Sequence, residues 1–316
     1  MKIIDLHCDV LYQLSKTSEP IQFSQAAELQ ASKEKLQAGH VIVQNFAIFI
    51  SEDVPPVEKF TEAMRQVELF HTNVLQPNPE FVHITDWKQL ESLKEGQIGA
   101  FLSLEGCDAI GDDLFKLQAF LDAGVKLVGL TWNFENVVAF GAEEAPDRGL
   151  KPFGKQVVKL LNEKDIIIDV SHLNEQSFWD VLPLAKHIIA SHSNARALCD
   201  HPRNLTDDQA LALVKNGGHI HVVYYPPFIR RDTEKVTLLH LAEHVSYLVD
   251  LVGVENIGLG SDFDGINQTI NGLETAAHSQ NLITTLLQQL SKEEVQMIAH
   301  RNFLNYVKNI EENRSM

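Results

Sequence analysis

Cysteine is scarce in this chain, and its placement excludes a covalent framework. The 316 residues contain only Cys8, Cys107 and Cys199. Three such scattered residues cannot all be paired, and none forms the CxxC spacing of a zinc ribbon. The sequence therefore favours a protein of a reducing compartment, and we expect it to be cytoplasmic.

Positive charge and long apolar runs are also missing. The net charge is −17 and there are no basic runs, so the surface repels phosphate backbones and nucleic-acid binding is not expected. No apolar run approaches the roughly 18 to 20 residues that a membrane span requires. The first apolar run starts at residue 2 and carries His7, so we expect neither a membrane anchor nor a signal peptide.

Interdomain linkers and nucleotide-binding motifs are absent as well. No stretch rich in proline, glycine and serine divides the chain, which predicts a single catalytic domain over residues 1–316. No GxGxxG or GxxxxGK[ST] motif follows an apolar run, so the nucleotide-binding α/β folds lack their signature.

What the chain does contain is a repeated alternation of short apolar runs and helical periodicity. Runs rich in valine, isoleucine and leucine are typical of parallel strands covered on both faces. Amphipathic stretches such as 57–75 lie between them, and "SKEE" (291–294) resembles a capping box that opens a helix. The pattern predicts an α/β protein with one (β/α)8 TIM barrel, and a doubly wound open sheet is the alternative. The eight runs are 2–7, 41–50, 98–104, 125–132, 165–172, 187–192, 219–225 and 256–263.

Polar residues gather where these runs end. Barrel enzymes build their sites at the carboxyl ends of the strands, so residues at several such ends are expected to share one site. The side chains in question are His7, Asp9, Glu105, His172, His192 and Asp262.

The spacing of His7 and Asp9 adds to this expectation. Alternate residues of a strand point to the same face, so these two side chains face one way and Cys8 faces the other, toward the helices. A carboxylate buried without compensation costs several kcal/mol, whereas a cation would compensate Asp9. Nitrogen and oxygen donors favour zinc, with manganese or cobalt as alternatives.

Each residue also has an ordinary explanation when it is taken alone. A single strand-end histidine is more often structural than a ligand, and Glu105 could be a carboxylate favoured by a helix dipole. Five such side chains at one rim favour a metal site over these ordinary explanations, because metal sites require convergent ligands. Between the two late aspartates, Asp264 precedes Gly265 and resembles a turn residue, so Asp262 is preferred as the site residue.

The chain also contains histidines that do not stand at the ends of these runs. "HIH" (219–221) opens the seventh run, and the opening end of a barrel strand is the stability face. We therefore expect His219 and His221 to be structural. His201 could line a pocket or cap a loop, and the sequence does not decide between them.

The chain resembles the membrane dipeptidase (renal dipeptidase) family of zinc metallopeptidases, family M19, within the amidohydrolase-type barrels. The motifs that carry the resemblance occur in the family's order and at similar spacing over nearly the whole chain. They are "DLHCD" (5–9), "LSLEG" (102–106), "DVSH" (169–172), "ASHSNARALCDHPRN" (190–204) and "GSDFDG" (260–265).

The resemblance implies a binuclear zinc site and a dipeptide substrate. Glu105 would bridge two Zn²⁺ ions, with His7 and Asp9 completing the ligands of one ion and His172 and His192 those of the other. Such a pair of ions lowers the pKa of a shared water, so that a bridging hydroxide attacks the peptide carbonyl.

Two further residues would handle the substrate. Arg203 would hold the terminal carboxylate, for which a guanidinium fork is well shaped. Asp262 would meet the free amino group and transfer protons. A cation for one terminus and an anion for the other favour dipeptides over longer peptides, and the family accepts D-configured C-terminal residues. Related enzymes are often dimers, so a homodimer is a candidate assembly.

One position departs from the family pattern. Mammalian members carry a histidine after the fourth strand that steadies the developing oxyanion, whereas this chain reads "LTWNFEN" with Trp132. An indole N–H donates one hydrogen bond but cannot become cationic. Either Trp132 or a neighbour such as Asn133 supplies the donor in the substrate pocket, or the activity is weaker or directed at another substrate.

Two other function classes remain open at this point. A lactonase or a deaminase could use the same barrel and metals, since a fold does not dictate its substrate. A non-catalytic metal-binding protein would require neither Arg203 nor Asp262. A substrate without a terminal carboxylate would have no use for Arg203.

Overall fold

Eight parallel strands close into a ring. The computed structural model describes residues 1–17 and 21–314. β1 pairs with both β2 and β9, and the ring closes where β2 pairs with β4 from Val43–Gly99 to Phe49–Glu105. The predicted (β/α)8 barrel is therefore confirmed, and the open-sheet alternative is wrong. The ring strands are β1 (Ile3–Asp5), β2 (Val41–Phe49), β4 (Ile98–Glu105), β5 (Val125–Gly129), β6 (Ile167–Asp169), β7 (Ile188–Ala190), β8 (His219–Val222) and β9 (Ile257–Leu259).

A ninth strand was not expected from the sequence. β3 (Phe81–His83) pairs only with β4, outside the ring. Phe81 is buried whereas Val82 and His83 are only partly buried, so β3 is not covered on both faces as the ring strands are.

The apolar runs form strands because both faces of the barrel wall are covered. On β4, Leu102 and Leu104 pack in the large core between the sheet and the helices, while Phe101 belongs to a second cluster that also contains Leu127 and Ile189. This second cluster fills the barrel interior, which explains why the strands are apolar on both sides.

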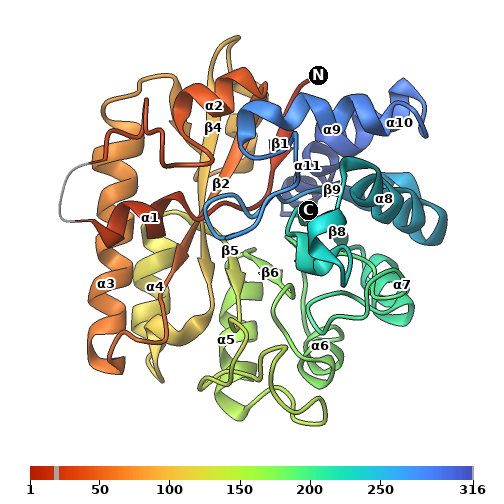
Figure 1. Cartoon of the computed structure of the whole chain (residues 1–316). Helices are drawn as coiled ribbons and strands as arrows, with labels where there is room; N and C mark the ends of the chain where they lie inside the picture. Colours follow the sequence, from red (N-terminus) through yellow and green to blue (C-terminus); the bar gives the residue numbers. More distant parts are fainter. Residues whose placement is uncertain (18–20, 315–316) are drawn as a thin grey trace.

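Helices surround the ring and follow the chain around it (Figure 1). The predicted 57–75 stretch is α3, which continues without a break as the π-helix η1. The predicted capping box is present, because Ser291 Oγ accepts from the Glu294 N–H and Glu294 Oε2 accepts from the Ser291 N–H. The α-helices are α1 (Val10–Lys16), α2 (Lys33–Ala38), α3 (Pro56–Leu69), α4 (Leu114–Asp122), α5 (Pro152–Glu163), α6 (Glu175–Val181), α7 (Asp207–Lys215), α8 (Leu238–Val252), α9 (Ser279–Leu286), α10 (Lys292–Gln296) and α11 (Asn302–Arg314). The π-helices are η1 (Phe70–Leu75) and η8 (Met297–Arg301), and the 3-10 helices are η2 (Trp87–Ser92), η3 (Cys107–Ile110), η4 (Pro226–Phe228), η5 (Thr233–Lys235), η6 (Val254–Asn256) and η7 (Ala276–His278).

The last helix closes the amino-terminal end of the barrel. Phe303 and Tyr306 of α11 join the interior cluster. The Tyr306 ring lies 4.7 Å from the ring of His219, and Phe303 lies 6.0 Å from that of His221. Both histidines thus lie at the closed end of the barrel, away from the rim where the polar strand ends meet, as expected for structural residues.

Within the described ranges, no helix combines the length and the apolar character needed to cross a bilayer. Cys8, Cys107 and Cys199 are all free and buried, and Cys8 packs in the core between sheet and helices as its position in the strand predicted.

Candidate metal centre and substrate pocket

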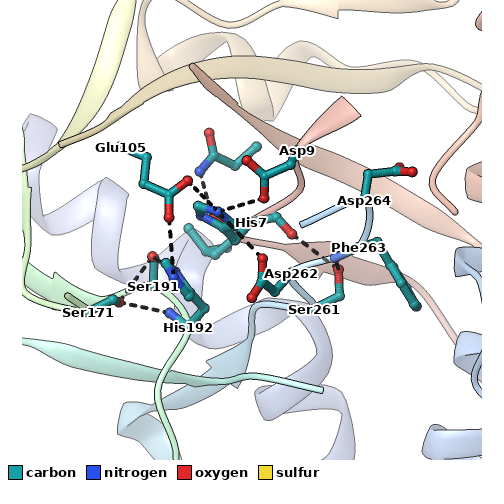
Figure 2. A network of polar contacts seen from close by, with 12 residues as sticks. His7, Asp9, Glu105, Ser171, Ser191, His192, Ser261, Asp262, Phe263 and Asp264 are labelled. Atoms are coloured by element: carbon teal, nitrogen blue, oxygen red, sulfur yellow. Dashed lines mark hydrogen bonds and ion pairs between the residues drawn. The ribbon is translucent and has the colours of Figure 1, made fainter. Parts of the chain in front are cut away.

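Side chains from five strand ends converge around His7 at the carboxyl rim of the barrel. His7 Nε2 lies 3.4 Å from Asp9 Oδ2, 3.3 Å from Glu105 Oε2 and 3.9 Å from Asp262 Oδ1. The ring of His192 is 3.9 Å from that of His7. Figure 2 shows these side chains pointing toward one another from strands far apart in the sequence. The structure therefore brings together the residues that the sequence placed at separate strand ends.

Glu105 occupies the centre of the group. One carboxylate oxygen, Oε2, faces His7, and the other, Oε1, lies 2.8 Å from His172 Nε2 and 3.8 Å from His192 Nε2. Burial would raise the pKa of Glu105, but the neighbouring His7 and His172 outweigh it and lower that pKa well below its ordinary value. Glu105 is therefore a carboxylate, and its two oxygens face different histidines.

The charges of the group favour a bound cation. Burial favours a neutral His7, yet Glu105 and Asp9 raise the pKa of this imidazole well above its ordinary value. Burial and the charge of Glu105 raise the pKa of Asp9. Two buried carboxylates thus compete for the same positive charge.

The unsatisfied atoms fit a metal. His7 Nδ1, His7 Nε2 and Asp9 Oδ1 are buried without a hydrogen-bond partner among the described residues, and such groups are costly unless something binds them. Ligand atoms of His7, Glu105 and His192 lie within 4.8 Å of one another, as do those of His7, Asp9 and Asp262. Imidazole nitrogens and carboxylate oxygens are the donors that zinc and related ions prefer.

His192 is held with its Nε2 free for such an ion. Ser191 Oγ donates to Asp169 Oδ2 and lies 2.7 Å from His192 Nδ1. Because the hydroxyl proton is directed at the carboxylate, its oxygen accepts from the Nδ1–H of His192. Burial lowers the pKa of His192 well below its ordinary value, so the ring is neutral and the Nε2 lone pair faces the site.

Asp5 fixes the segment that follows β9 and carries Asp262. Asp5 Oδ1 accepts from the Ser261 N–H at 2.7 Å, and Asp5 Oδ2 accepts from the Ser261 hydroxyl at 2.6 Å. The Asp262 N–H donates to the His7 carbonyl at 3.1 Å. These supporting residues were not identified from the sequence, although Asp5, Asp169, Ser191 and Ser261 all stand at or beside the ends of predicted strands.

Gly265 allows two carboxylates to approach the backbone. A Cβ atom at this position would lie 2.2 Å from Asp9 Oδ2 and 2.4 Å from Asp262 Oδ1. Any side chain at residue 265 would therefore displace both groups.

Arg203 is buried beside the group with much of its hydrogen-bonding capacity unused. Its Nη2 donates to His172 Nε2 at 3.1 Å and to the His192 carbonyl at 3.4 Å, whereas Nε and Nη1 have no partner among the described residues. The side chain is only 2% exposed, and burial lowers its pKa to about 10. The residue is therefore a desolvated cation with donors available for an anionic ligand.

The two late aspartates have different surroundings. Asp264 accepts from the backbone N–H groups of Gln30 and Ala31 at 2.7 and 2.9 Å, so it anchors a loop. Asp262 faces His7, and burial raises its pKa well above the ordinary value, with the charge of Asp9 adding to the effect of burial. The geometry thus agrees with the preference for Asp262 over Asp264.

A cavity of about 370 Å³ opens over this group. One wall is a row of aromatic rings, in which Tyr12 lies 5.0 Å from Phe49 and Phe49 lies 5.3 Å from Trp132. His201 and Phe228 lie beside Arg203, and His201 lines the cavity. A larger groove of about 760 Å³ runs along α11 at the closed end, but it contains none of the convergent donors.

Comparison with known proteins places these residues in a family. The model for the membrane dipeptidases, peptidase family M19, matches residues 1–316. An uncharacterised dipeptidase of Schizosaccharomyces pombe is 30% identical over 98% of this chain and 80% of its own length. An uncharacterised protein encoded in the pqqA 5′ region of Klebsiella pneumoniae is 35% identical over 70% of this chain and 86% of its own.

Solved structures share the fold. A metallopeptidase of Rhodobacter sphaeroides, liganded with a phosphinate mimic of the dipeptide L-Ala-D-Ala, has a TM-score of 0.90 at 24% identity and covers 98% of this chain and 99% of its own. The probable dipeptidase PvdM of Pseudomonas aeruginosa has a TM-score of 0.86 at 22% identity, covering 98% and 96%. A Burkholderia multivorans amidohydrolase with bound zinc has a TM-score of 0.52 at 12% identity, covering 87% and 86%.

Proposed function

This chain belongs to the membrane dipeptidase family, and from its place among these metal-dependent dipeptidases we propose that it hydrolyses dipeptides with two zinc ions bound by Glu105 and its neighbours. The proposed ligands are those that the sequence indicated. His7 and Asp9 would hold one ion, His172 and His192 the other, and Glu105 both.

The position of Glu105 supports two ions rather than one. Its Oε2 faces His7 while its Oε1 faces His172, which is the arrangement of a carboxylate that serves two centres. A pair of divalent ions bound here would supply a hydroxide at neutral pH and polarise the scissile carbonyl. The zinc in the Burkholderia multivorans amidohydrolase supports zinc as the metal.

The single observation that carries the substrate assignment is the buried Arg203. A guanidinium that is 2% exposed, with Nε and Nη1 unpartnered, is unfavourable unless an anion binds there. A substrate carboxylate would accept two parallel hydrogen bonds from such a fork. We therefore assign Arg203 to the C-terminal carboxylate of the dipeptide.

Asp262 is placed to serve the other end of the substrate and the proton transfer. It lines the same cavity as Arg203 and lies 3.9 Å from His7 Nε2. Its raised pKa makes it a better proton acceptor than an exposed aspartate. We propose that Asp262 contacts the free amino group, takes a proton from the attacking water and returns it to the leaving amine.

These two anchors select substrate length. A longer peptide would lack a charged terminus at one anchor and leave Arg203 or Asp262 buried without its partner. The ligand of the Rhodobacter sphaeroides enzyme mimics a dipeptide with a D-configured C-terminal residue, which supports testing such dipeptides first.

Trp132 lines the cavity as part of the aromatic row. Its indole N–H has no hydrogen-bond partner among the described residues, whereas both polar atoms of the Asn133 side chain are in use. We propose Trp132 as the donor toward the substrate carbonyl oxygen in place of the histidine of mammalian relatives.

Two broader expectations remain proposals. All eight ring strands, from Ile3 to Leu259, close one sheet, which supports a single catalytic unit over residues 1–316. The three free, buried cysteines support a reducing, cytoplasmic setting. Light scattering would distinguish a monomer from the homodimer common among relatives.

A substrate panel with metal analysis tests the function. The zinc-loaded protein should bind two ions per chain and hydrolyse L,L or L,D dipeptides, while tripeptides and C-terminally amidated dipeptides should be poor substrates. Full metal loading with turnover of lactones or aminated bases and no dipeptide turnover would contradict the proposal and favour the alternative hydrolase.

A further inference from the structure

The side chain of Asn133, in the loop after β5, makes a short contact with a proposed metal ligand. Asn133 Oδ1 lies 2.8 Å from His172 Nδ1. An amide oxygen only accepts hydrogen bonds, so the imidazole donates from Nδ1–H and its lone pair is on Nε2. The Nε2 atom faces Glu105 and His192, at 2.8 Å from each.

Two other contacts fix this assignment of hydrogens. Asn133 Nδ2 lies 3.4 Å from Glu143 Oε1, and only the amide nitrogen can donate to a carboxylate. Arg203 Nη2, which can only donate, lies 3.1 Å from His172 Nε2. If the amide oxygen and nitrogen of Asn133 were exchanged, an amide N–H would face an N–H donor at His172, and the amide oxygen would face the Glu143 carboxylate. The observed orientation of the amide therefore satisfies the contacts with both residues.

The loop around Asn133 is fastened to the backbone of His172 as well. The Ala142 N–H donates to the His172 carbonyl at 2.8 Å, and Thr131 Oγ1 donates to the same carbonyl at 3.3 Å. The loop folds back so tightly that a Cβ atom on Gly141 would lie 2.2 Å from the Asn133 carbonyl carbon. Asn133 is thus held at a fixed place relative to the imidazole.

The two histidines of the proposed second ion are supported by different chemistry. His192 is held by a hydroxyl that is bonded to the buried carboxylate of Asp169. His172 is held by a neutral amide whose other end reaches the exposed Glu143. Loss of either support would let its ring rotate or change tautomer, which removes the Nε2 lone pair from the metal.

We propose that Asn133 is a positioning residue for the metal, which fixes His172 in the Nδ1–H tautomer and directs its Nε2 at the ion. This inference rests on the proposed function, in which His172 binds metal. It assigns Asn133 a role different from the oxyanion donor considered from the sequence, because its amide oxygen and nitrogen are both engaged away from the substrate carbonyl.

The test compares three variants by zinc affinity in competition with a chelator. Asn133→Leu removes the acceptor for His172. It should lower the affinity for one of the two zinc ions about 10- to 100-fold and leave the affinity for the other ion unchanged. The double variant Asn133→Asp/Glu143→Gln keeps an acceptor for His172 and reverses the polarity of the outer contact, so it should bind both ions at least as tightly as the wild type. Asn305→Leu makes the same substitution on the exposed surface of α11 and should leave both affinities unchanged.

A second readout does not require metal or turnover. The ¹⁵N NMR spectrum of the metal-free protein reports the tautomer of each imidazole, and the His172 signals are assigned as those that disappear in His172→Gln. These signals should show Nδ1 protonated and Nε2 unprotonated. Asn133→Leu should give a mixture of tautomers, with thermal stability measured in parallel to show that the barrel is folded.

The outcomes separate the two levels of the account. A wild-type chain that binds no metal would overturn the proposed function and this inference with it. Wild-type affinity for both ions in Asn133→Leu, or a double variant as weak as Asn133→Leu, would overturn this inference alone.

Discussion

The Nε2 atoms of His172 and His192 lie 2.8 Å apart at the carboxyl rim of the barrel, and the Nδ1 atom of each ring is hydrogen-bonded elsewhere. Burial lowers the pKa of His172 to about 4, with Arg203 adding to the effect of burial. Both rings are therefore neutral, and two lone pairs face each other beside the Glu105 carboxylate. Arg203 Nη2 donates to the Nε2 of His172 and offsets part of the repulsion among these groups, and a bound cation would offset more of it.

Zinc should stabilise the fold through Glu105. Ligand binding to the native state alone adds about 2.7 kcal/mol when the free ion is at 100 times its Kd. Thermal denaturation should therefore show a zinc-dependent rise in Tm, and Glu105→Gln should lose most of it. Glu91→Gln, on the exposed surface of η2, is the matched control. An unchanged zinc response in Glu105→Gln would contradict the bridging role.

Arg203 should matter for the substrate carboxylate and not for folding. Charge-assisted hydrogen bonds contribute about 1.5 to 3 kcal/mol, so Arg203→Met should lower kcat/KM for dipeptides by about 10- to 100-fold. The zinc-loaded variant should unfold at nearly the wild-type temperature, because the bound ions would neutralise the carboxylates that Arg203 faces in the metal-free protein.

Two comparisons make the Arg203 prediction specific. Arg231→Met, whose side chain is 82% exposed, should keep dipeptide activity. Residual activity on amidated dipeptides should be little affected by Arg203→Met. An equal loss on free and amidated dipeptides would argue that Arg203 does not bind the carboxylate.

Gly265→Ala should disable the site with little effect on the fold. The added methyl would lie within 2.4 Å of oxygens of Asp9 and Asp262, so both carboxylates must move. Zinc affinity and kcat should fall together, measured by chelator competition and dipeptide turnover. Gly129→Ala, whose Cβ would meet nothing closer than 3.4 Å, serves as the control, and wild-type zinc binding in Gly265→Ala would refute the predicted displacement.

The closed end of the barrel should make the protein sensitive to acid independently of metal. Burial lowers the pKa of His219 to about 4 and that of His221 to about 3, with His219 adding to the effect at His221. The unfolded chain binds these protons near pH 6.5 and the folded chain does not. The unfolding free energy should therefore be greatest above pH 6.5 and fall toward pH 4, by about 1.4 kcal/mol per group per pH unit.

Variants isolate this contribution. Urea unfolding with chelator present should show a flatter pH dependence in His219→Leu and His221→Leu than in the wild type. His278→Gln, at a position where the side chain is 43% exposed, should retain the wild-type slope. Parallel slopes in all four proteins would show that the barrel-end histidines do not titrate in this way.

The barrel was predictable because its strands are covered on both faces. Each of the eight apolar runs overlaps a ring strand, although several runs extend beyond it: β5 ends at Gly129 while the run continues to Trp132. Apolar composition reports burial rather than hydrogen bonding, so it does not show where the ladder stops. β3 was missed for the converse reason, since it pairs on one side only and two of its three residues are partly buried.

The candidate ligands were predictable from their type and position, but their supports were not. Imidazole and carboxylate at successive strand ends point to a metal whatever the detailed geometry. The partnership of Asn133 with His172 joins residues 39 apart in the chain. It depends on how the loop after β5 folds back, which no local pattern encodes.

Anomalous diffraction at the zinc edge from zinc-loaded crystals tests the central claim most directly. The account predicts two peaks at the carboxyl rim, both within bonding distance of Glu105, one beside His7 and Asp9 and the other beside His172 and His192. A single peak that does not involve Glu105, or no peak among these five side chains, would contradict it.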